Sequence, residues 1–254
     1  MVHRKFNDVV SLVEPGDLLV FNDTKVIPAR LFGQKVTGGL IEILVERILD
    51  NQRILAQVRV SKPPHVGDEL IFPNNIRLEV LGRQHQFYEL RYNGNAGTIL
   101  EMIESIGQIP LPPYMHRQAE DSDKERYQTV YARYKGSVAA PTAGFHFDSE
   151  LLQQLADKDV QMGYLTLHIG AGTFAPVRVE NILDHKMHNE YLDVSPALCQ
   201  QIKETKARGK RVIAVGTTSL RALETASQSG ETQPYQGDTS IFIYPSFSIH
   251  IASP

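Results

Sequence analysis

The chain has 254 residues, of which 42% are hydrophobic and 22% charged, a composition typical of a soluble globular protein. The formal net charge of −3 excludes a strong overall attraction to nucleic acid or membranes, so a nucleic-acid partner would need a local basic patch. The single cysteine, Cys199, excludes a disulfide framework and indicates a reducing, cytoplasmic compartment. No apolar run approaches the length of a membrane span.

The first half of the sequence predicts one short strand after another. The segments are rich in β-branched and aromatic residues, and turn-forming residues such as Gly-Gly and Pro-Asn-Asn separate most of them. The predicted strands cover 17–22, 29–36, 40–48, 54–60, 69–72, 76–81 and 87–92. Evenly spaced strands without intervening helices favour a small, mostly antiparallel β-barrel. A helix over 98–107 follows, because Ile99, Leu100, Ile103 and Ile106 share one helical face.

Helices and strands alternate in the second half. Helices are predicted over 148–159, with Asp148 or Ser149 as N-cap, over 195–209, from Ser195 and Pro196 to Gly209, and over 218–228. Strands are predicted over 160–169, 210–216 and 240–245. This alternation indicates an α/β layer with an at least partly parallel sheet. The predicted fold class is therefore α/β with a β-barrel, in two domains: a barrel domain over 24–108, and an α/β domain over 1–23 and 109–254.

Four stretches carry more Gly, Thr, His and Arg than packing requires: 140–147, 167–178, 184–191 and 214–224. In the second, Gly170 and Gly172 fit the spacing of a dinucleotide-binding turn, G-x-G-x-x-A. That interpretation requires a helix directly after the glycines, and Pro176 with the following alternating valines excludes one. Two interpretations remain, a turn at a strand end and a loop whose backbone approaches a ligand closely.

The stretch 214–224 combines a strand end with a helix start. Gly216, Thr217, Thr218 and Ser219 would present N–H groups and hydroxyls together, and Arg221 on the first turn could bind a carboxylate or phosphate. An ordinary N-cap with a surface arginine explains the same spacing equally well. The basic run 203–211 is most simply a solvated helix end, with an RNA-facing patch as the weaker alternative.

Histidines gather in the same region of the sequence. His146, His168, His185 and His188 are four of the nine in the chain, and each lies in or beside a polar motif. His185-x-x-His188-x-Glu190 invites a metal site, completed by His146 or His168, but the spacing is loose and no H-E-x-x-H occurs. Acid–base chemistry is the better functional use, since histidine titrates near neutrality. We therefore predict no metal site.

The motifs together resemble one family. In chain order they are "GDLLVFNDTKVIPARLFG", "APTAGFHF", "LHIGAGTFAPVR", "HKMHNEY", "VIAVGTTSLRALE" and "IFIYP". They are similar to the motifs of the S-adenosylmethionine:tRNA ribosyltransferase-isomerase family of the queuosine pathway, and the resemblance runs from about Asn7 to Pro245. It implies an α/β domain with a β-barrel domain, in agreement with the pattern of elements above.

The resemblance also implies a reaction. The family acts on tRNA carrying 7-aminomethyl-7-deazaguanine at the wobble position. It transfers and isomerises the ribosyl part of S-adenosylmethionine onto that base, which gives epoxyqueuosine and releases adenine and methionine. S-adenosylmethionine is thus a co-substrate, and no cofactor is expected. We expect a cytoplasmic monomer that binds tRNA and S-adenosylmethionine and no membrane.

We assign roles to the unusual residues as hypotheses. The sulfonium acidifies the protons on the 5′ carbon of the ribose, so that a base of modest strength could start the reaction, and adenine departure benefits from a proton donor. The methionine carboxylate would take an arginine or N–H partner. Acid–base candidates are His168, His185, His188 and Glu190. Donor-binding candidates are Thr142, Gly144, His146, Gly170, Gly172, Thr173, Phe174, Arg178, Gly216, Thr217, Thr218, Ser219 and Arg221.

The two ends depart from the family pattern. The family has a further segment before the one equivalent to Phe6, and after "IFIYP" a valine-rich segment and an Asn-Phe-His-Leu-Pro-type motif, where this chain reads "SFSIHIASP". We therefore expect a chain truncated at both ends with an incomplete α/β domain. Two alternatives to a competent enzyme stay open: a module that binds S-adenosylmethionine or tRNA without turnover, and a metal-dependent hydrolase built on His146, His185 and His188.

Overall fold

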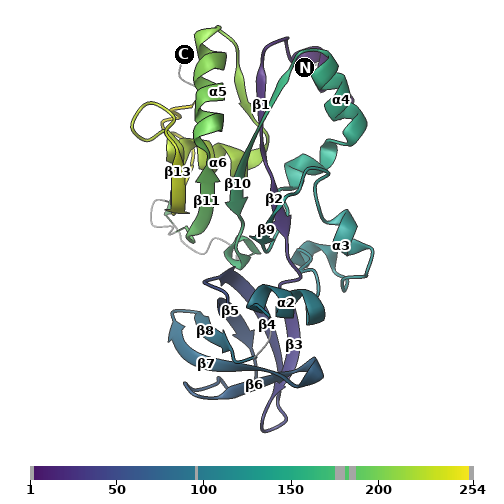
Figure 1. Cartoon of the computed structure of the whole chain (residues 1–254), viewed down its shortest axis with the longest axis vertical. Helices are drawn as coiled ribbons and strands as arrows, with labels where there is room; N and C mark the ends of the chain where they lie inside the picture. The colour runs from purple at the N-terminus through teal and green to yellow at the C-terminus, as the bar shows by residue number, and fades with distance from the viewer. Residues whose placement is uncertain (1–2, 95–96, 175–180, 183–186, 252–254) are drawn as a thin grey trace.

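A closed barrel and a mixed sheet form the two ends of the molecule in the computed structural model, which describes residues 3–94, 97–174, 181–182 and 187–251. The barrel lies at one end of the long axis, and the sheet with its helices lies at the other, together with both chain termini (Figure 1). The predicted class, an α/β fold with a mostly antiparallel β-barrel, is confirmed. The predicted domain limits at 24 and 108 stay a prediction.

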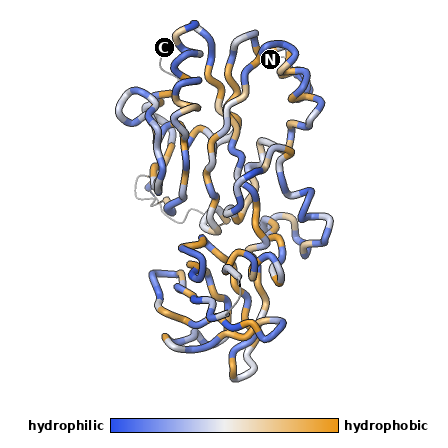
Figure 2. Tube along the Cα trace, viewed as in Figure 1, coloured by the Kyte–Doolittle hydropathy of each residue, from blue (hydrophilic) through white to orange (hydrophobic). Residues whose placement is uncertain are grey.

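Strand alternation builds the barrel. The strands pair antiparallel in the closed order β3 (Arg30–Lys35), β4 (Leu40–Ile48), β5 (Arg53–Arg59), β8 (Phe87–Tyr92), β7 (Ile76–Gln84) and β6 (Glu69–Phe72). On β4, Ile41, Ile43 and Val45 are buried inside while Glu42 and Leu44 face outward, because successive side chains point to opposite faces. Hydrophobic and hydrophilic positions accordingly alternate along the barrel strands in Figure 2.

Helix α2 (Ile99–Ile106) packs onto the barrel, as its apolar face predicts. Thr98 is the N-cap and accepts a hydrogen bond from the Glu101 N–H, while the Glu101 carboxylate accepts one from the Thr98 N–H. Ile99 and Ile103 are fully buried in the barrel core. The helix therefore extends the hydrophobic core of the barrel.

The sheet of the α/β part has β1 near its centre. Its order is β12 (Val212–Ala214), β1 (Leu18–Asn22), β10 (Gln161–His168), β11 (Glu190–Val194) and β13 (Tyr235–Thr239). Strand β1 runs parallel to β10 and β12, whereas β11 runs antiparallel to β10 and β13. Every residue of β1 is buried, which is typical of a strand covered on both faces.

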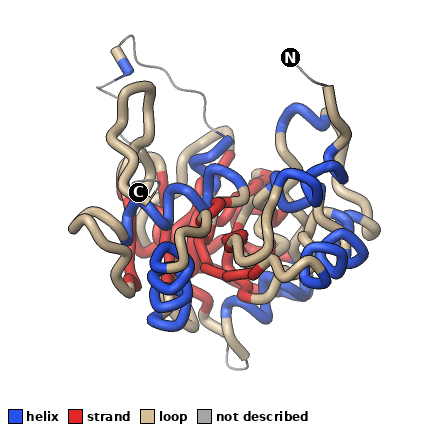
Figure 3. Tube along the Cα trace, turned by 90° about the horizontal axis from the view of Figure 1, so that it is seen from above, coloured by secondary structure: helices blue, strands red, loops and turns tan. Residues whose placement is uncertain are grey.

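Helices cover both faces of this sheet. Leu18 and Val20 share a core with α5 (Pro196–Ala207) and α6 (Gly216–Ala226), and Leu19 and Phe21 share another with α4 (Ser149–Asp157). Figure 3 shows the strands in the middle with helices around them. Within the described part of the chain, no helix combines the length and apolar character that crossing a membrane requires.

The predicted helix ends are confirmed where capping residues marked them. Asp148 accepts a hydrogen bond from the Leu151 N–H (2.7 Å), and Ser195 accepts one from the Leu198 N–H (3.2 Å). Gly209 follows α5 with φ +66°, a conformation that favours glycine. Helix α6 begins at Gly216, two residues earlier than predicted, so Thr217 already lies in its first turn.

The strand predicted over 240–245 is wrong. These residues, all of them described, form no strand, and the edge beside β11 is occupied instead by β13. Its sequence, Tyr-Gln-Gly-Asp-Thr, lacks the apolar run that suggested the later segment. Pairing with β11 across five register positions decided the outcome, and single-sequence propensity does not show such pairing.

A second, two-stranded sheet links the two parts of the molecule and was not predicted. Strand β2 (Thr24–Val26) pairs parallel with β9 (Tyr134–Ser137). The short elements that remain are η1 (Phe6–Asp8), α1 (Val9–Leu12), η2 (Pro73–Asn75), η3 (Pro113–Met115), α3 (Asp123–Arg126), η4 (Thr142–His146) and η5 (Ala171–Phe174).

Asn22 continues the β1–β10 pairing after the backbone of β1 turns away. Its side-chain amide donates to the Leu167 carbonyl (3.0 Å) and accepts from the Leu167 N–H (3.0 Å). Asn22 and Leu167 are both buried, so water does not replace these bonds. The amide thereby acts as an extra peptide group and fixes the end of β10.

We expect Asn22→Ala to lower the free energy of unfolding by about 2–4 kcal/mol, because it leaves two buried backbone groups of Leu167 without partners. Urea denaturation measures this change. Gln200→Ala is the matched control, since Gln200 is exposed and bonds only Glu204 one turn away, and we expect a change within about 0.5 kcal/mol. Equal losses in the two variants would contradict the role given to Asn22.

Candidate functional site

The candidate site lies at the carboxyl ends of β1, β10 and β12. Strand β10 ends at His168, β1 ends at Asn22, and β12 leads through Val215 into α6. In open α/β sheets this edge is where ligands bind, because the loops that follow the strands gather there. Described residues of three predicted motifs lie at this edge, since His168 ends β10, Glu190 begins β11 and Gly216 begins α6.

His168 is the terminal residue of β10 and is largely enclosed. Its Nδ1 lies 2.7 Å from the Thr24 hydroxyl, and its ring stacks on Tyr191 of the neighbouring strand at 5.8 Å between centroids. A Cβ at Gly136 would lie 2.7 Å from Nε2, so a residue without a side chain is needed there. Burial, assisted by the positive charge of Arg47, lowers the pKa of His168 to about 4. The imidazole is therefore unprotonated at neutral pH.

Two residues of the "NDTK" stretch support this end of β10. Thr24 hydrogen-bonds the His168 ring, and the buried Asp23 carboxylate accepts a bond from the Thr166 hydroxyl (2.7 Å). Burial raises the pKa of Asp23, and the bond from Thr166 opposes the rise. The sequence interpretation did not assign Asp23 or Thr24 to the site, although three polar residues, Asn22 to Thr24, directly after the apolar run Leu18–Phe21 were a usable signal.

The loop after β10 is packed so closely that its glycines are required. The Ile169 N–H donates to the buried Ser137 hydroxyl (2.9 Å), which fixes the start of the loop. A Cβ at Gly170 would lie 2.3 Å from Oε1 of Glu46, and one at Gly172 would lie 2.2 Å from the His188 ring. The loop is therefore a backbone segment held against side chains on more than one side.

Glu190 and Arg221 form a buried ion pair beside this loop. Glu190 begins β11, and Arg221 lies on α6; each is 8% exposed, so the pair is shielded from solvent. Burial raises the pKa of Glu190, and the Arg221 charge opposes the rise. Oε1 of Glu190 also accepts a bond from the Gly170 N–H (3.3 Å). Glu190 thus ties the loop to α6 through Arg221.

Arg221 also bonds backbone carbonyls. One of its Nη atoms donates to the carbonyls of His188 (3.0 Å) and Thr239 (3.2 Å). The His188 ring, which covers Gly172, meets the Phe87 ring of the barrel edge-on at 6.0 Å between centroids. In this structure Arg221 is therefore paired with the carboxylate of Glu190. The predicted binding of a ligand carboxylate by Arg221 stays a prediction.

Glu46 reaches the candidate site from the barrel. The β4–β5 register shifts between Val45 and Arg47, so Glu46 is the extra residue of a β-bulge, a feature that re-aims side chains. Its carboxylate accepts a bond from the Gly172 N–H (3.1 Å), and the residue is 5% exposed. Burial raises the pKa of Glu46 to about 7, the charge of Glu190 adds to the rise, and the backbone N–H bonds oppose it.

The sequence interpretation missed Glu46. Along 40–48, Leu40 and Leu44 interrupt the alternation of Ile41, Ile43 and Val45, so the sequence shows no clear change of phase at the bulge. In the folded barrel, Val45 and Glu46 are both buried although they are adjacent, as expected where one residue is inserted into a strand.

The start of α6 lies against the "APTAGFHF" stretch. Gly216 has φ +85°, and a Cβ there would lie 3.0 Å from the Cβ of Ala143. Among the described residues, the buried hydroxyl oxygens of Thr218 and Ser219 have no hydrogen-bond partner, nor has Nε of Arg221. This helix end therefore combines a positive dipole with unused donors.

Among the other predicted site residues, Thr173 joins this network, since its N–H donates to the Gly170 carbonyl (3.2 Å). His146 is exposed and stacks on Phe6 at 4.7 Å between centroids, and Thr142, Thr173 and Thr217 are exposed. Gly144 packs against Tyr131, since a Cβ there would lie 2.1 Å from its hydroxyl. Phe174 is partly buried and contacts the hydrophobic cores of both the barrel and the sheet.

Two predicted residues, Arg178 and His185, lie outside the described residues. Within the described ranges no three His, Cys, Asp or Glu side chains are close enough to hold a metal ion. The described part of the chain therefore gives no support to a hydrolase built on histidine ligands.

A model of the queuosine biosynthesis protein family matches residues 1–253. The chain belongs to this family. Among solved structures, it is similar to the S-adenosylmethionine tRNA ribosyltransferase of Thermotoga maritima, with 29% sequence identity, 99% of this chain and 69% of that chain covered, and a TM-score of 0.44. The predicted membership of a queuosine-pathway family is thus confirmed.

We expect Gly170→Ala in this queuosine-family chain to lower the free energy of unfolding by about 1–3 kcal/mol, because the new methyl group would overlap the Glu46 carboxylate. Denaturant unfolding measures the change. Gly39→Ala is the control, since a Cβ at Gly39 meets nothing within 4 Å. An alanine tolerated equally at both positions would show that the loop is not held as closely as described.

Glu46 predicts a pH-dependent stability. Its folded pKa of about 7 lies above the ordinary value of 4.5, so the folded state holds the proton more tightly. The stabilisation is complete below pH 4.5 and is lost as pH rises through 7, by roughly 3 kcal/mol in the free energy of unfolding. Thermal or urea unfolding between pH 4.5 and 8 measures the slope.

Glu46→Gln should remove this part of the slope, because the amide keeps an oxygen for the Gly172 N–H and does not titrate. Glu190 adds a slope of the same sign, so the difference between wild type and variant gives the contribution of Glu46 together with its coupling to Glu190. Glu125→Gln, at an exposed position, should keep the wild-type slope. A Glu46→Gln profile parallel to wild type would refute the assignment.

Proposed function

We propose that the chain is an S-adenosylmethionine:tRNA ribosyltransferase-isomerase. It would transfer and isomerise the ribosyl group of S-adenosylmethionine onto 7-aminomethyl-7-deazaguanine in tRNA, give epoxyqueuosine, and release adenine and methionine. Membership of the queuosine biosynthesis family supports this. The observation that carries it is the convergence of distant motifs on one loop: Gly170 and Gly172 meet Glu46, His188 and Glu190.

His168 fits the proposed role of proton acceptor. The sulfonium of the donor acidifies the neighbouring 5′ protons, and a group that removes one of them must be unprotonated at neutral pH. Burial keeps His168 in that form, and the Thr24 hydroxyl fixes its ring. A free imidazole with a pKa of about 4 carries no proton at neutral pH, so His168 could give a proton to departing adenine only after it has taken one from the 5′ carbon. We propose His185, His188 or Glu190 for that step.

The donor would lie between the Gly170–Phe174 loop and the start of α6. The helix N–H groups and the unused hydroxyls of Thr218 and Ser219 suit the methionine carboxylate. We keep all the donor-binding residues assigned from the sequence as proposals. S-adenosylmethionine would be consumed as a co-substrate, with tRNA as the second substrate. The monomeric state and the cytoplasmic location stay predictions.

An assay of adenine release tests the function. We expect the protein, mixed with S-adenosylmethionine and tRNA carrying 7-aminomethyl-7-deazaguanine at the wobble position, to release adenine and methionine in equal amounts. His168→Ala should lower kcat by about 10²–10⁴-fold, the range of a lost acid–base group. Chromatography of the released products measures both.

His65→Ala is the control, because His65 is an exposed barrel residue and should leave kcat unchanged. Unchanged turnover of His168→Ala at saturating substrates would remove His168 from the acid–base chemistry. If calorimetry showed binding of S-adenosylmethionine but no adenine were released, the protein would be a binding protein and the proposed enzymatic function would be wrong.

A further inference from the structure

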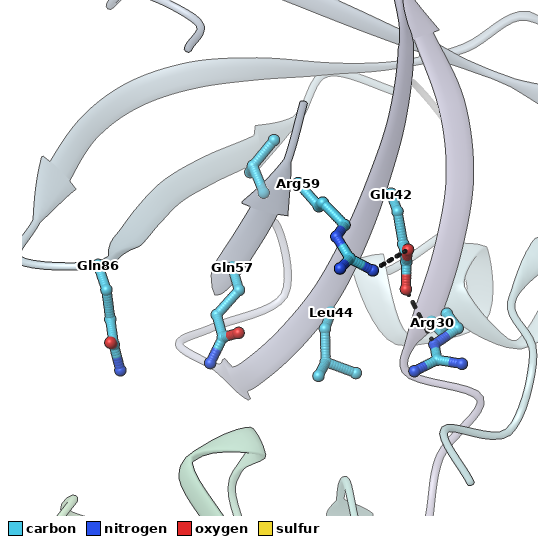
Figure 4. A pocket seen from close by; sticks show the side chains of 7 residues that line it. Arg30, Glu42, Leu44, Gln57, Arg59 and Gln86 are labelled. Atoms are coloured by element: carbon cyan, nitrogen blue, oxygen red, sulfur yellow. Dashed lines mark ion pairs between the residues drawn. The ribbon is translucent and has the colours of Figure 1, made fainter. Parts of the chain in front are cut away.

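A polar groove of about 430 Å³ lies on the outer face of the barrel (Figure 4). It is formed by outward-facing residues of β3, β4 and β5 and by the β7–β8 hairpin. Its main lining side chains are Arg30, Glu42, Leu44, Gln57, Arg59 and Gln86. None of them belongs to the site described above.

The groove offers positive charge that is only partly neutralised. Glu42 lies between two guanidinium groups, 3.2 Å from Nε of Arg30 and 3.7 Å from an Nη of Arg59. The Arg59 side chain is 87% exposed, so this ion pair contributes little and is easily exchanged for another anion. Two cations against one carboxylate leave a net positive charge for a ligand.

The other lining residues add hydrogen-bonding and apolar groups. Figure 4 shows Gln57, Gln86 and Leu44 pointing to the same side as the Arg30 guanidinium. Each glutamine amide carries two N–H donors and one carbonyl acceptor, which suit hydroxyl groups and base edges. Leu44 provides an apolar surface between them. Phosphate, ribose and base together require this combination of groups.

Two lining residues of the groove lie close in the chain to residues of the candidate site. Along β4, Leu44 lies two residues before Glu46, a distance of about 7 Å by strand geometry. At the hairpin, Gln86 directly precedes Phe87, whose ring contacts the ring of His188. A polymer in the groove would therefore pass close to the residues that contact the Gly170–Gly172 loop.

We propose that this groove binds the ribose-phosphate backbone of the RNA substrate next to the base that is modified. The proposal rests on the proposed function, which requires a tRNA substrate. Arg30 and Arg59 contact phosphate, and Gln57 and Gln86 contact ribose or base edges. The groove is thus the local basic patch that the net charge of −3 makes necessary.

Binding of an RNA stem-loop, measured across a salt series, tests the groove. The probe is an anticodon stem-loop with 7-aminomethyl-7-deazaguanine at the wobble position. Arg59→Ala should weaken affinity about tenfold at low salt, and Arg59→Glu more. For Arg59→Ala the slope of log Kd against log salt should fall by about 0.7–0.9, the loss of one phosphate contact. Folding is not at risk, because the Arg59 side chain is exposed.

Arg77→Ala is the matched control. Arg77 also lies on a barrel strand and pairs at the surface with one glutamate, Glu69, but it does not line the groove. We expect Arg77→Ala to keep the wild-type affinity and salt slope.

If both Arg59 variants kept the wild-type affinity and salt slope while the wild-type protein released adenine, the RNA-binding role of the groove would be overturned and the proposed function would stand. A wild-type protein that neither binds the stem-loop nor releases adenine would overturn the proposed function. Arg59-dependent binding of adenosine monophosphate with unchanged stem-loop binding would make the groove a mononucleotide site and overturn the RNA proposal.

Discussion

The Gly170–Gly172 backbone lies between two buried carboxylates, and the rest of the site depends on this contact. Glu46 reaches it from the barrel, and Glu190 reaches it from the sheet. Each carboxylate accepts an N–H of the loop, and Glu46 comes so close that a side chain on Gly170 would overlap it. The loop, the barrel and α6 are thereby held in one arrangement, because Glu190 in turn binds Arg221.

The two buried glutamates differ in the positive charge near them, and this gives them different pKa shifts. Glu190 has Arg221 beside it, whereas Arg47, the cation whose charge acts on Glu46, is held by a bidentate bond to Asp238 at 2.8 and 2.9 Å. An acid buried without a close counter-ion retains its proton to a higher pH. The barrel side of the loop therefore carries a variable charge near neutrality, while Arg221 on the sheet side favours the ionised form of Glu190.

Local sequence patterns predicted most helices and strands. The features that they did not predict depend on pairing between segments far apart in the chain. The β-branched and apolar residues of 40–48 and the caps at Ser195 and Asp148 predicted the barrel strand and the helices, because those signals act within a few residues. The edge strand Tyr235–Thr239 depends on β11, more than forty residues earlier in the chain, and has no apolar run of its own. Glu46 is similar: the register shift between Val45 and Arg47 shows only in the pairing of β4 with β5, and only the folded arrangement shows that Glu46 faces the loop.

Strand β4 has a consequence for how the two halves of the molecule communicate. Within a few residues it passes from the groove at Leu44 to the loop at Glu46 and to β13 through Arg47 and Asp238. If a ligand in the groove displaced this strand, the Glu46 carboxylate would be displaced with it. Binding free energies linked in this way are reciprocal, so a ligand at the loop would change the affinity of the groove by the same factor. The coupling between the two places would then be a property of a single strand.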